Sequence, residues 1–208
     1  MNASDTTRQK IIDAARARFA HYGYGKTTMA DVADDCAMSP GNLYRYFAGK
    51  LDIAEEIARA ASIRTTEELS HILIQSDRSA AERLHDFLFH DLRATYHALE
   101  KDPKLVEMAQ IITQERPHFH DEGLEREREV LVRIVEFGNI SGEFHVADPL
   151  FIAEMIQSAT LKFSYPQLFS SLSLDLLERE LEGVYQLVIA GLRAGVSAVE
   201  APQDMVDA

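Results

Sequence analysis

The feature that most constrains this chain is the spacing of its apolar residues, which recur at intervals of three and four positions along almost its whole length. Alternating apolar and polar runs, which are typical of half-buried strands, are scarce. Asp102-Pro103 and Asp148-Pro149 each indicate a helix cap followed by proline at the first helical position. The sequence therefore predicts an all-α fold of about nine helices.

Caps and breakers divide this pattern into expected helices. The first begins at Asp5 or Thr6 and ends near Gly23, and the second is capped by Thr28 with Asp31 three residues later. Ser39 and Pro40 begin the third, which we expect to end near Phe47. Further helices are expected over 50–74, 79–100, 103–115, 119–138, 148–165 and 173–194, with a loop over 138–144 that contains two glycines.

Size and composition indicate a soluble protein with a sizeable hydrophobic core. The chain has 208 residues, of which 46% are hydrophobic, and its one cysteine, Cys36, excludes an intrachain disulfide. The N-terminus lacks a basic segment followed by an apolar one, and no apolar run approaches the roughly 18 residues that span a bilayer. We therefore expect a cytoplasmic protein with no membrane partner.

Charge is distributed unevenly. The net charge of −13 argues against a nucleic-acid partner for the chain as a whole. Residues 1–50, however, hold seven Lys and Arg against five Asp and Glu, a balance of +2, whereas the remainder holds 14 against 29, a balance of −15. The N-terminal quarter is therefore the stretch that a polyanion can approach without strong repulsion.

Residues 28–47 combine a short capped helix, a three-residue turn and a second short capped helix, which is the spacing of a helix-turn-helix. A helix that reads base edges must lie deep in the major groove, and the small residues Ser39, Pro40 and Gly41 at its start permit this approach. The amides at that end also favour phosphates. The sequence therefore predicts a DNA-reading helix that begins at Ser39.

The side chains of this segment that a core does not need are the candidate DNA contacts. Arg45 suits a bidentate contact with guanine, and Asn42 suits an adenine or a phosphate. Tyrosine hydroxyls, threonine hydroxyls and a lysine at a helix start suit phosphates. The candidates are Thr27, Thr28, Ser39, Gly41, Asn42, Tyr44, Arg45, Tyr46 and Lys50.

The run T-T-M-A-D-V-A-D-D-C-A-M-S-P-G-N-L-Y-R-Y-F-A-G-K-L-D-I resembles the signature of TetR (tetracycline-repressor) family regulators. The resemblance is dense over about residues 8–55, and beyond residue 60 only the layout of helices is similar. Two departures are Tyr46, where the family most often has histidine, and Met38, which replaces the commoner valine. The resemblance implies a helix-turn-helix domain over 1–52 and a ligand-binding and dimerisation domain over 53–208, in a repressor that a small molecule releases from DNA.

One helix-turn-helix buries too little surface to hold a half-site tightly, so we expect a homodimer that reads a near-palindrome. The last two helices carry apolar residues at helical spacing, which favours them as the interface over a wholly buried core. Candidate interface residues are Ile152, Met155, Ile156, Ala159, Leu177, Leu181, Val184 and Val188. Candidate effector-binding residues are Phe87, Tyr96, Met108, Ile112, Phe119 and Phe163.

Other classes fit the sequence less well. It contains no glycine-rich phosphate loop, nucleophile elbow or H-E-x-x-H motif, so we expect no catalytic activity and no cofactor. Two sets have a helical spacing that solvated faces also show, so we expect no metal site: Glu82, Asp86 and His90, and His118 with Asp121 or Glu122. A helical adaptor protein would explain the net charge but not the Ser39–Lys50 array, and an activator remains an alternative within the same fold.

Overall fold

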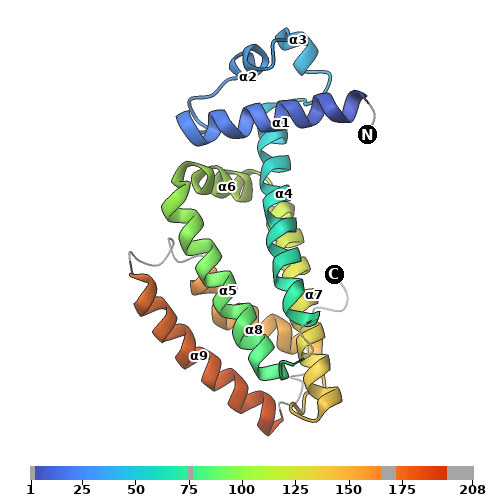
Figure 1. The fold of residues 1–208 in the computed structure, drawn as a ribbon, viewed down its shortest axis with the longest axis vertical. Helices are drawn as coiled ribbons and strands as arrows, with labels where there is room; N and C mark the ends of the chain where they lie inside the picture. The colour runs from blue at the N-terminus through green and yellow to red at the C-terminus, as the bar shows by residue number, and fades with distance from the viewer. Residues whose placement is uncertain (1–2, 75–76, 165–171, 196–208) are drawn as a thin grey trace, which may run out of the picture. The chain divides into compact units, whose positions relative to one another are not determined.

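The structure is a computed structural model that describes residues 3–74, 77–164 and 172–195 (Figure 1). The described part forms nine α-helices and one 3-10 helix, which confirms the expected all-α fold. The bounds are α1 Ala3–Tyr22, α2 Met29–Asp35, α3 Pro40–Leu43, α4 Lys50–Ser70, η1 His71–Ile74, α5 Ala80–Lys101, α6 Pro103–Glu115, α7 Pro117–Ser141, α8 Pro149–Ser164 and α9 Leu174–Ala194.

The predicted caps of α2 and α3 are confirmed. The Thr28 side chain accepts from the Asp31 amide while the Asp31 carboxylate accepts from the Thr28 amide, a reciprocal capping box. Ser39 caps α3 and Pro40 occupies its first position. The predicted end of this helix at Phe47 is wrong: α3 ends at Leu43, because the amides of Arg45 and Tyr46 bond to carbonyls three residues back and tighten the chain into a turn.

The ends of α4 and α7 also differ from the sequence prediction. The segment expected as one helix to Ile74 changes to a 3-10 helix after Ser70. The loop expected from Gly138 begins later, since α7 continues to Ser141. Gly138 is buried inside the helix, where a Cβ atom would overlap the ring of Phe144. This glycine therefore serves close packing and not a turn.

The chain forms two compact units. Unit 1 comprises residues 1–67 and 96–125, with α2 packed on α1 and α3, and α6 packed on α1 (Figure 1). Its core combines the helix-turn-helix with residues much later in the chain. The buried members are Ile11, Ile12, Ala15, Phe19, Met29, Val32, Ala33, Cys36, Leu43, Phe47, Ile53, Ala54, Ile57, Met108, Ile112 and Phe119.

Unit 2 comprises residues 68–95 and 126–208, and within it α8 packs on α9. Its largest fully buried side chains include Leu69, Leu84, Leu92, Leu131, Ile134, Phe144 and Leu177. None of the described helices is long and apolar enough to cross a membrane.

Candidate nucleic-acid interface

The loop before α2 is fixed from inside unit 1. Gly23 adopts a φ of +88°, and the Thr27 hydroxyl donates to its carbonyl at 3.0 Å. Lys50 Nζ, at the start of α4, donates to the carbonyls of Tyr24 at 2.7 Å and Thr27 at 2.8 Å, and it lies 4.1 Å from the centre of the Tyr24 ring. The Lys50 ammonium group therefore connects the start of α4 to the loop before α2.

The turn between α2 and α3 is as short as the sequence predicts. Ala37 has a φ of +53°, a conformation that reverses the chain within three residues at some cost for a side chain with a Cβ. Lys10 Nζ of α1 donates to the Cys36 carbonyl at 2.8 Å, and the Cys36 side chain is buried. Burial raises the pKa of this thiol, which fits a core residue and not a reactive one.

Helix α3 has one buried side and one exposed side. Leu43 and Phe47 are buried in the unit 1 core. On the other side, Tyr44 is 53% exposed, and Arg45 is also exposed. This side also includes Ser39, Pro40 and Gly41, all exposed, and Asn42, which is partly buried. The surface that begins at Ser39 and includes Arg45 is called the α3 face below.

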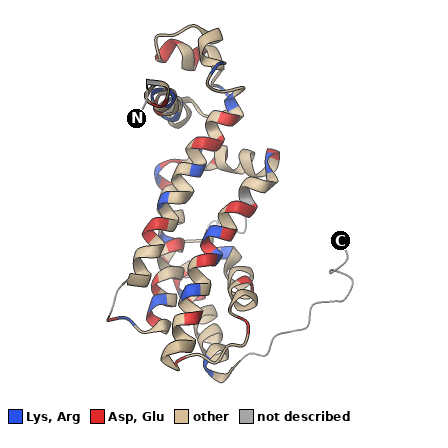
Figure 2. Ribbon diagram, turned by 90° about the vertical axis from the view of Figure 1, so that its right-hand side faces the viewer, with Lys and Arg blue, Asp and Glu red and all other residues tan. Residues whose placement is uncertain are grey.

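Most cations of the first fifty residues are engaged within the protein, and Figure 2 shows Lys and Arg mixed with Asp and Glu rather than gathered in one patch. Arg18 makes two bonds to Asp35, at 2.6 and 2.8 Å, and lies 3.6 Å from Asp31. This contact lowers the pKa of Asp35, and the bonds from Thr28 lower the pKa of Asp31. Arg8 bonds to Glu56 and to a main-chain carbonyl.

Lys26 and Arg45 are different. Both are exposed, and neither side chain bonds to a described residue. Lys26 lies in the loop before α2 and Arg45 lies two residues after the end of α3, so they flank the helix-turn-helix. Lys26 is not among the predicted DNA contacts, although it lies only two residues before the Thr28 cap.

Four predicted DNA contacts interact with other parts of the protein in the structure. Thr27 is only 1% exposed and its hydroxyl donates to the Gly23 carbonyl, so its contact with DNA stays a prediction that this burial does not favour. The exposed Thr28 hydroxyl is shared with the Asp31 carboxylate. Lys50 is partly buried, and burial lowers its pKa. Tyr46 is partly buried and packs on the core of unit 1.

The predicted effector-binding residues fall in both units. Met108, Ile112 and Phe119 belong to the core that the helix-turn-helix shares with α6, where α6 packs on α1. Tyr96 is a partly buried residue of the same unit. Phe87 and Phe163 are buried in unit 2. The structure therefore gives the first three a core role and leaves the binding role of the six a prediction.

The predicted dimer residues also lie on two faces. Ile152, Ile156, Leu177 and Leu181 are buried within unit 2, because α8 and α9 pack on their own chain there. Met155 and Ala159 are exposed, and Val184 and Val188 are partly exposed. Leu187, which is not among the predicted interface residues, is 76% exposed on α9.

Among residues 3–74, 77–164 and 172–195, no three or more His, Cys, Asp or Glu side chains are grouped so that they could hold a metal ion. In the set on α5, Glu82 accepts from the Ser79 amide at 2.9 Å and Asp86 lies 3.8 Å from Arg78. His90 Nε2 lies 3.5 Å from Glu68.

Two family models match the chain. Residues 11–61 match bacterial regulatory proteins of the tetR family, and residues 80–185 match the tetracyclin repressor-like C-terminal domain. Curated relatives match over about a quarter of this chain. The probable acrEF/envCD operon repressor of Escherichia coli K12 is 39% identical over 51 residues, which are 24% of this chain and 23% of that protein. The transcriptional repressor KstR2 of Mycobacterium tuberculosis H37Rv is 34% identical over 55 residues, 26% of this chain and 28% of the relative.

Solved structures are similar over nearly the whole chain, at identities that show the fold alone. A TetR-family regulator from Mesorhizobium loti has a TM-score of 0.70 at 17% identity and covers 91% of this chain and 98% of its own. The fatty acid degradation regulator FadR from Bacillus halodurans has a TM-score of 0.64 at 21% identity, with 89% and 96% covered.

The curated relatives therefore share about a quarter of their length with this chain, whereas the second family model alone covers half of it. The helix-turn-helix, the order of the nine described helices and both family models agree. The chain belongs to the TetR family of bacterial regulatory proteins.

Proposed function

We propose that this protein is a transcriptional repressor that binds a near-palindromic operator as a homodimer and is released from it by a small organic effector. In this proposal residues 1–52 bind DNA, and residues 53–208 bind the effector and form the dimer. The activity is regulatory and not catalytic. The observation that carries the proposal is the α3 face, where exposed groups at the start of a capped helix lie beside Arg45, a cation with no partner among the described residues.

The charge pattern supports DNA as the partner. An exposed arginine without an internal partner can present both of its terminal nitrogens to a guanine or a phosphate. Lys26 offers a second such cation at the other end of the helix-turn-helix. Cations with internal partners hold the fold instead, so we expect the loss of either of these two exposed cations to weaken binding and leave stability unchanged.

The effector role rests on the family and its solved members. RolR, with a TM-score of 0.63 at 17% identity over 90% of this chain and 87% of its own, has been solved with resorcinol. SmeT, with a TM-score of 0.59 at 19% identity over 89% and 90%, has been solved with triclosan. Both ligands are small organic molecules, and we propose the same general class of effector for this protein.

The test measures binding of the full chain to duplexes from its own upstream region and to a scrambled duplex. Fluorescence anisotropy reports the affinity at each salt concentration of a series. We expect specific binding in the nanomolar range with a clear salt slope, and a loss of roughly tenfold or more in Arg45→Ala. Arg133→Ala is the matched control, because Arg133 is also exposed and without a described partner but lies on α7 in unit 2.

Melting temperature and dimer content should be the same in both variants and the natural protein. Operator affinity that survives Arg45→Ala would remove α3 as the reading helix. Equal and weak binding to upstream, scrambled and further genomic duplexes would favour the adaptor alternative.

A further inference from the structure

Helices α5, α7 and α8 each contribute one polar side chain to a cluster in unit 2. Asp91 on α5, Glu127 on α7 and Ser164 on α8 belong to this cluster, and the Ser164 hydroxyl donates to Asp91 Oδ2 at 2.9 Å. The Glu127 side chain makes no hydrogen bond or ion pair with any described residue. Asp91 is near enough for its charge to act on Glu127. The two carboxylates therefore form a pair in which one member has no bonding partner.

Both carboxylates are recessed below the surface. Their side chains keep a small accessible area, yet burial is the main cause of the raised pKa at each of them. Burial and the nearby Asp91 charge raise the pKa of Glu127 to about 8, and burial raises the pKa of Asp91. A group that is mostly enclosed by protein but still reachable lies where a ligand atom can approach it.

The charged neighbours do not neutralise this pair. Arg126 on α7 favours the ionised form of Glu127, but burial and Asp91 outweigh it. His90 and the Ser164 bond favour the ionised form of Asp91, and burial again outweighs them. The buried His90 Nε2 lies 3.5 Å from Glu68 in a geometry that makes no hydrogen bond. Unmatched buried groups of this kind are uncommon in folded proteins and concentrate at functional sites.

Apolar side chains lie one helical turn from each carboxylate. Phe87 precedes Asp91 by four residues on α5, and Leu131 follows Glu127 by four on α7, so each pair shares a helix face. Phe163, next to Ser164 on α8, is buried as well. A molecule that binds the carboxylates would thus lie within about one helical turn of apolar side chains, which favours a ligand with an apolar body and a polar head.

We propose that Glu127 and Asp91, with Ser164, form a subsite for the protonated amine of a small amphiphilic effector. The inference rests on the proposed function, since it assigns a chemical class to the effector proposed above. A protonated amine supplies the positive charge and several N–H donors that the pair lacks. An anionic head group would be repelled by the same carboxylates, and a neutral hydroxyl would satisfy one of them without balancing charge.

The subsite should release a proton when it binds an amine. Near neutral pH, Glu127 holds a proton because its pKa is about 8, whereas an alkylamine with a pKa near that of lysine is charged. The cation favours the ionised carboxylate, so binding transfers the Glu127 proton to solvent. Affinity should therefore rise as pH increases from 6 to 8.

The experiment uses the full chain and two matched probe pairs, hexylamine with hexanol and 2-phenylethylamine with 2-phenylethanol. Melting temperature and calorimetric affinity are measured at pH 6 and pH 8, in buffers with different ionisation enthalpies. We expect the amines to raise the melting temperature more than their alcohols, to bind at least about tenfold more tightly at pH 8, and to release protons. Glu127→Gln should lose the amine preference and its pH dependence.

Glu129→Gln is the control, because Glu129 is exposed on the same helix and should leave both properties intact. A second measurement needs no ligand. Glu127→Gln should melt higher than the natural protein at pH 8 and similarly at pH 5, because a carboxyl group with a raised pKa destabilises the fold as pH rises from its unfolded pKa, about 4.3, toward 8.

The inference would be overturned if the alcohols stabilise as much as the amines, if no amine stabilises the protein, or if Mg²⁺ or Ca²⁺ does so instead. It would equally be overturned if Glu127→Gln keeps the pH dependence. Operator binding measured separately distinguishes the two proposals. Specific DNA binding without an amine response removes only the subsite, and an amine response without specific DNA binding removes only the repressor.

Discussion

Gly41 lies at the second position of α3, on the exposed side of the helix. A Cβ added there would meet no heavy atom of the protein within 4 Å. Its backbone has no positive φ, so the fold does not need glycine at this position. Glycine is the residue that most weakens a helix other than proline, and its presence therefore fits a requirement from outside the chain, the approach of DNA to the backbone.

Replacing Gly41 with alanine should separate folding from DNA binding. We expect Gly41→Ala to raise the free energy of unfolding by roughly 0.5 kcal/mol, from better helix propensity and a less flexible unfolded chain. Operator affinity should fall roughly tenfold, about 1.4 kcal/mol, because the methyl group holds the helix away from the groove. Chemical denaturation and anisotropy measure the two quantities. An unchanged affinity would show that α3 does not approach DNA at this residue.

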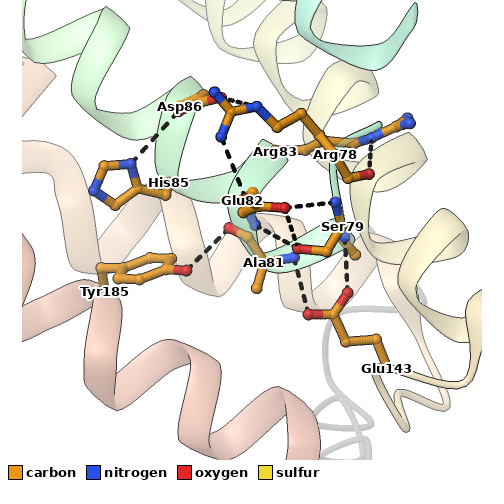
Figure 3. A network of polar contacts seen from close by, with 10 residues as sticks. Arg78, Ser79, Ala81, Glu82, Arg83, His85, Asp86, Glu143 and Tyr185 are labelled. Carbon is orange, nitrogen blue, oxygen red and sulfur yellow. Dashed lines mark hydrogen bonds and ion pairs between the residues drawn. The ribbon is translucent and has the colours of Figure 1, made fainter. Parts of the chain in front are cut away.

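At the scale of one element, the start of α5 shows how distant segments fix a helix. Ser79 and Glu82 form a capping box, in which the Ser79 amide donates to Glu82 at 2.9 Å (Figure 3). Glu143, from the segment after α7, accepts from the amides of Ala80 at 2.8 Å and Ala81 at 3.3 Å. Its carboxylate also lies 3.2 Å from Arg193 of α9, so it joins α5 to α9 at the positive end of the helix dipole.

Removing this second cap should destabilise unit 2. Glu143→Ala leaves two amides at the start of α5 without their acceptor, and we expect the free energy of unfolding to fall by about 1–2 kcal/mol. Glu136→Ala, an exposed residue of α7 with no described partner, should change it by less than about 0.5 kcal/mol. Urea unfolding followed by circular dichroism gives both values. Equal stability of the two variants would mean that the capping box alone holds this helix end.

At the scale of the whole molecule, the last two helices bear on whether the protein forms a dimer. Their inward residues complete the core of unit 2, yet α8 and α9 still expose apolar side chains. On α9 the exposed or partly exposed apolar positions recur at helical spacing, which indicates a face that a second copy could cover. They are Leu176, Val184, Leu187 and Val188.

A charge on this face should separate the protomers. Leu187 is 76% exposed, so Leu187→Glu should leave each chain folded and shift the dimer to monomer, with operator affinity falling by more than tenfold, about 1.4 kcal/mol. Ile140→Glu is the matched control, because Ile140 is 86% exposed on α7. Sedimentation velocity reports the state of both variants. A dimeric Leu187→Glu protein would place the interface elsewhere.

The local structure of the DNA-binding region follows from its sequence. The caps at Thr28 and Ser39, the proline at the start of α3 and the buried side of α3 all depend on residues within a few positions, so short-range rules predict them. The same rules located α6, α8 and α9 to within one residue at each end. The end of α3 and the glycine of α7 were missed, since a tight turn and the Phe144 ring decided them.

Only the tertiary structure decided what apolar and charged residues far apart in the chain do. Met108, Ile112 and Phe119 share a core with the helix-turn-helix, and Ile152 and Leu177 belong to the core of unit 2, although sequence periodicity gives them the same appearance as pocket or interface residues. The sequence does not predict the Asp91 and Glu127 pair, because the two residues lie 36 positions apart on different helices. Sequence periodicity shows which face of a helix is apolar, but only packing determines what covers that face and which charges are left without a partner.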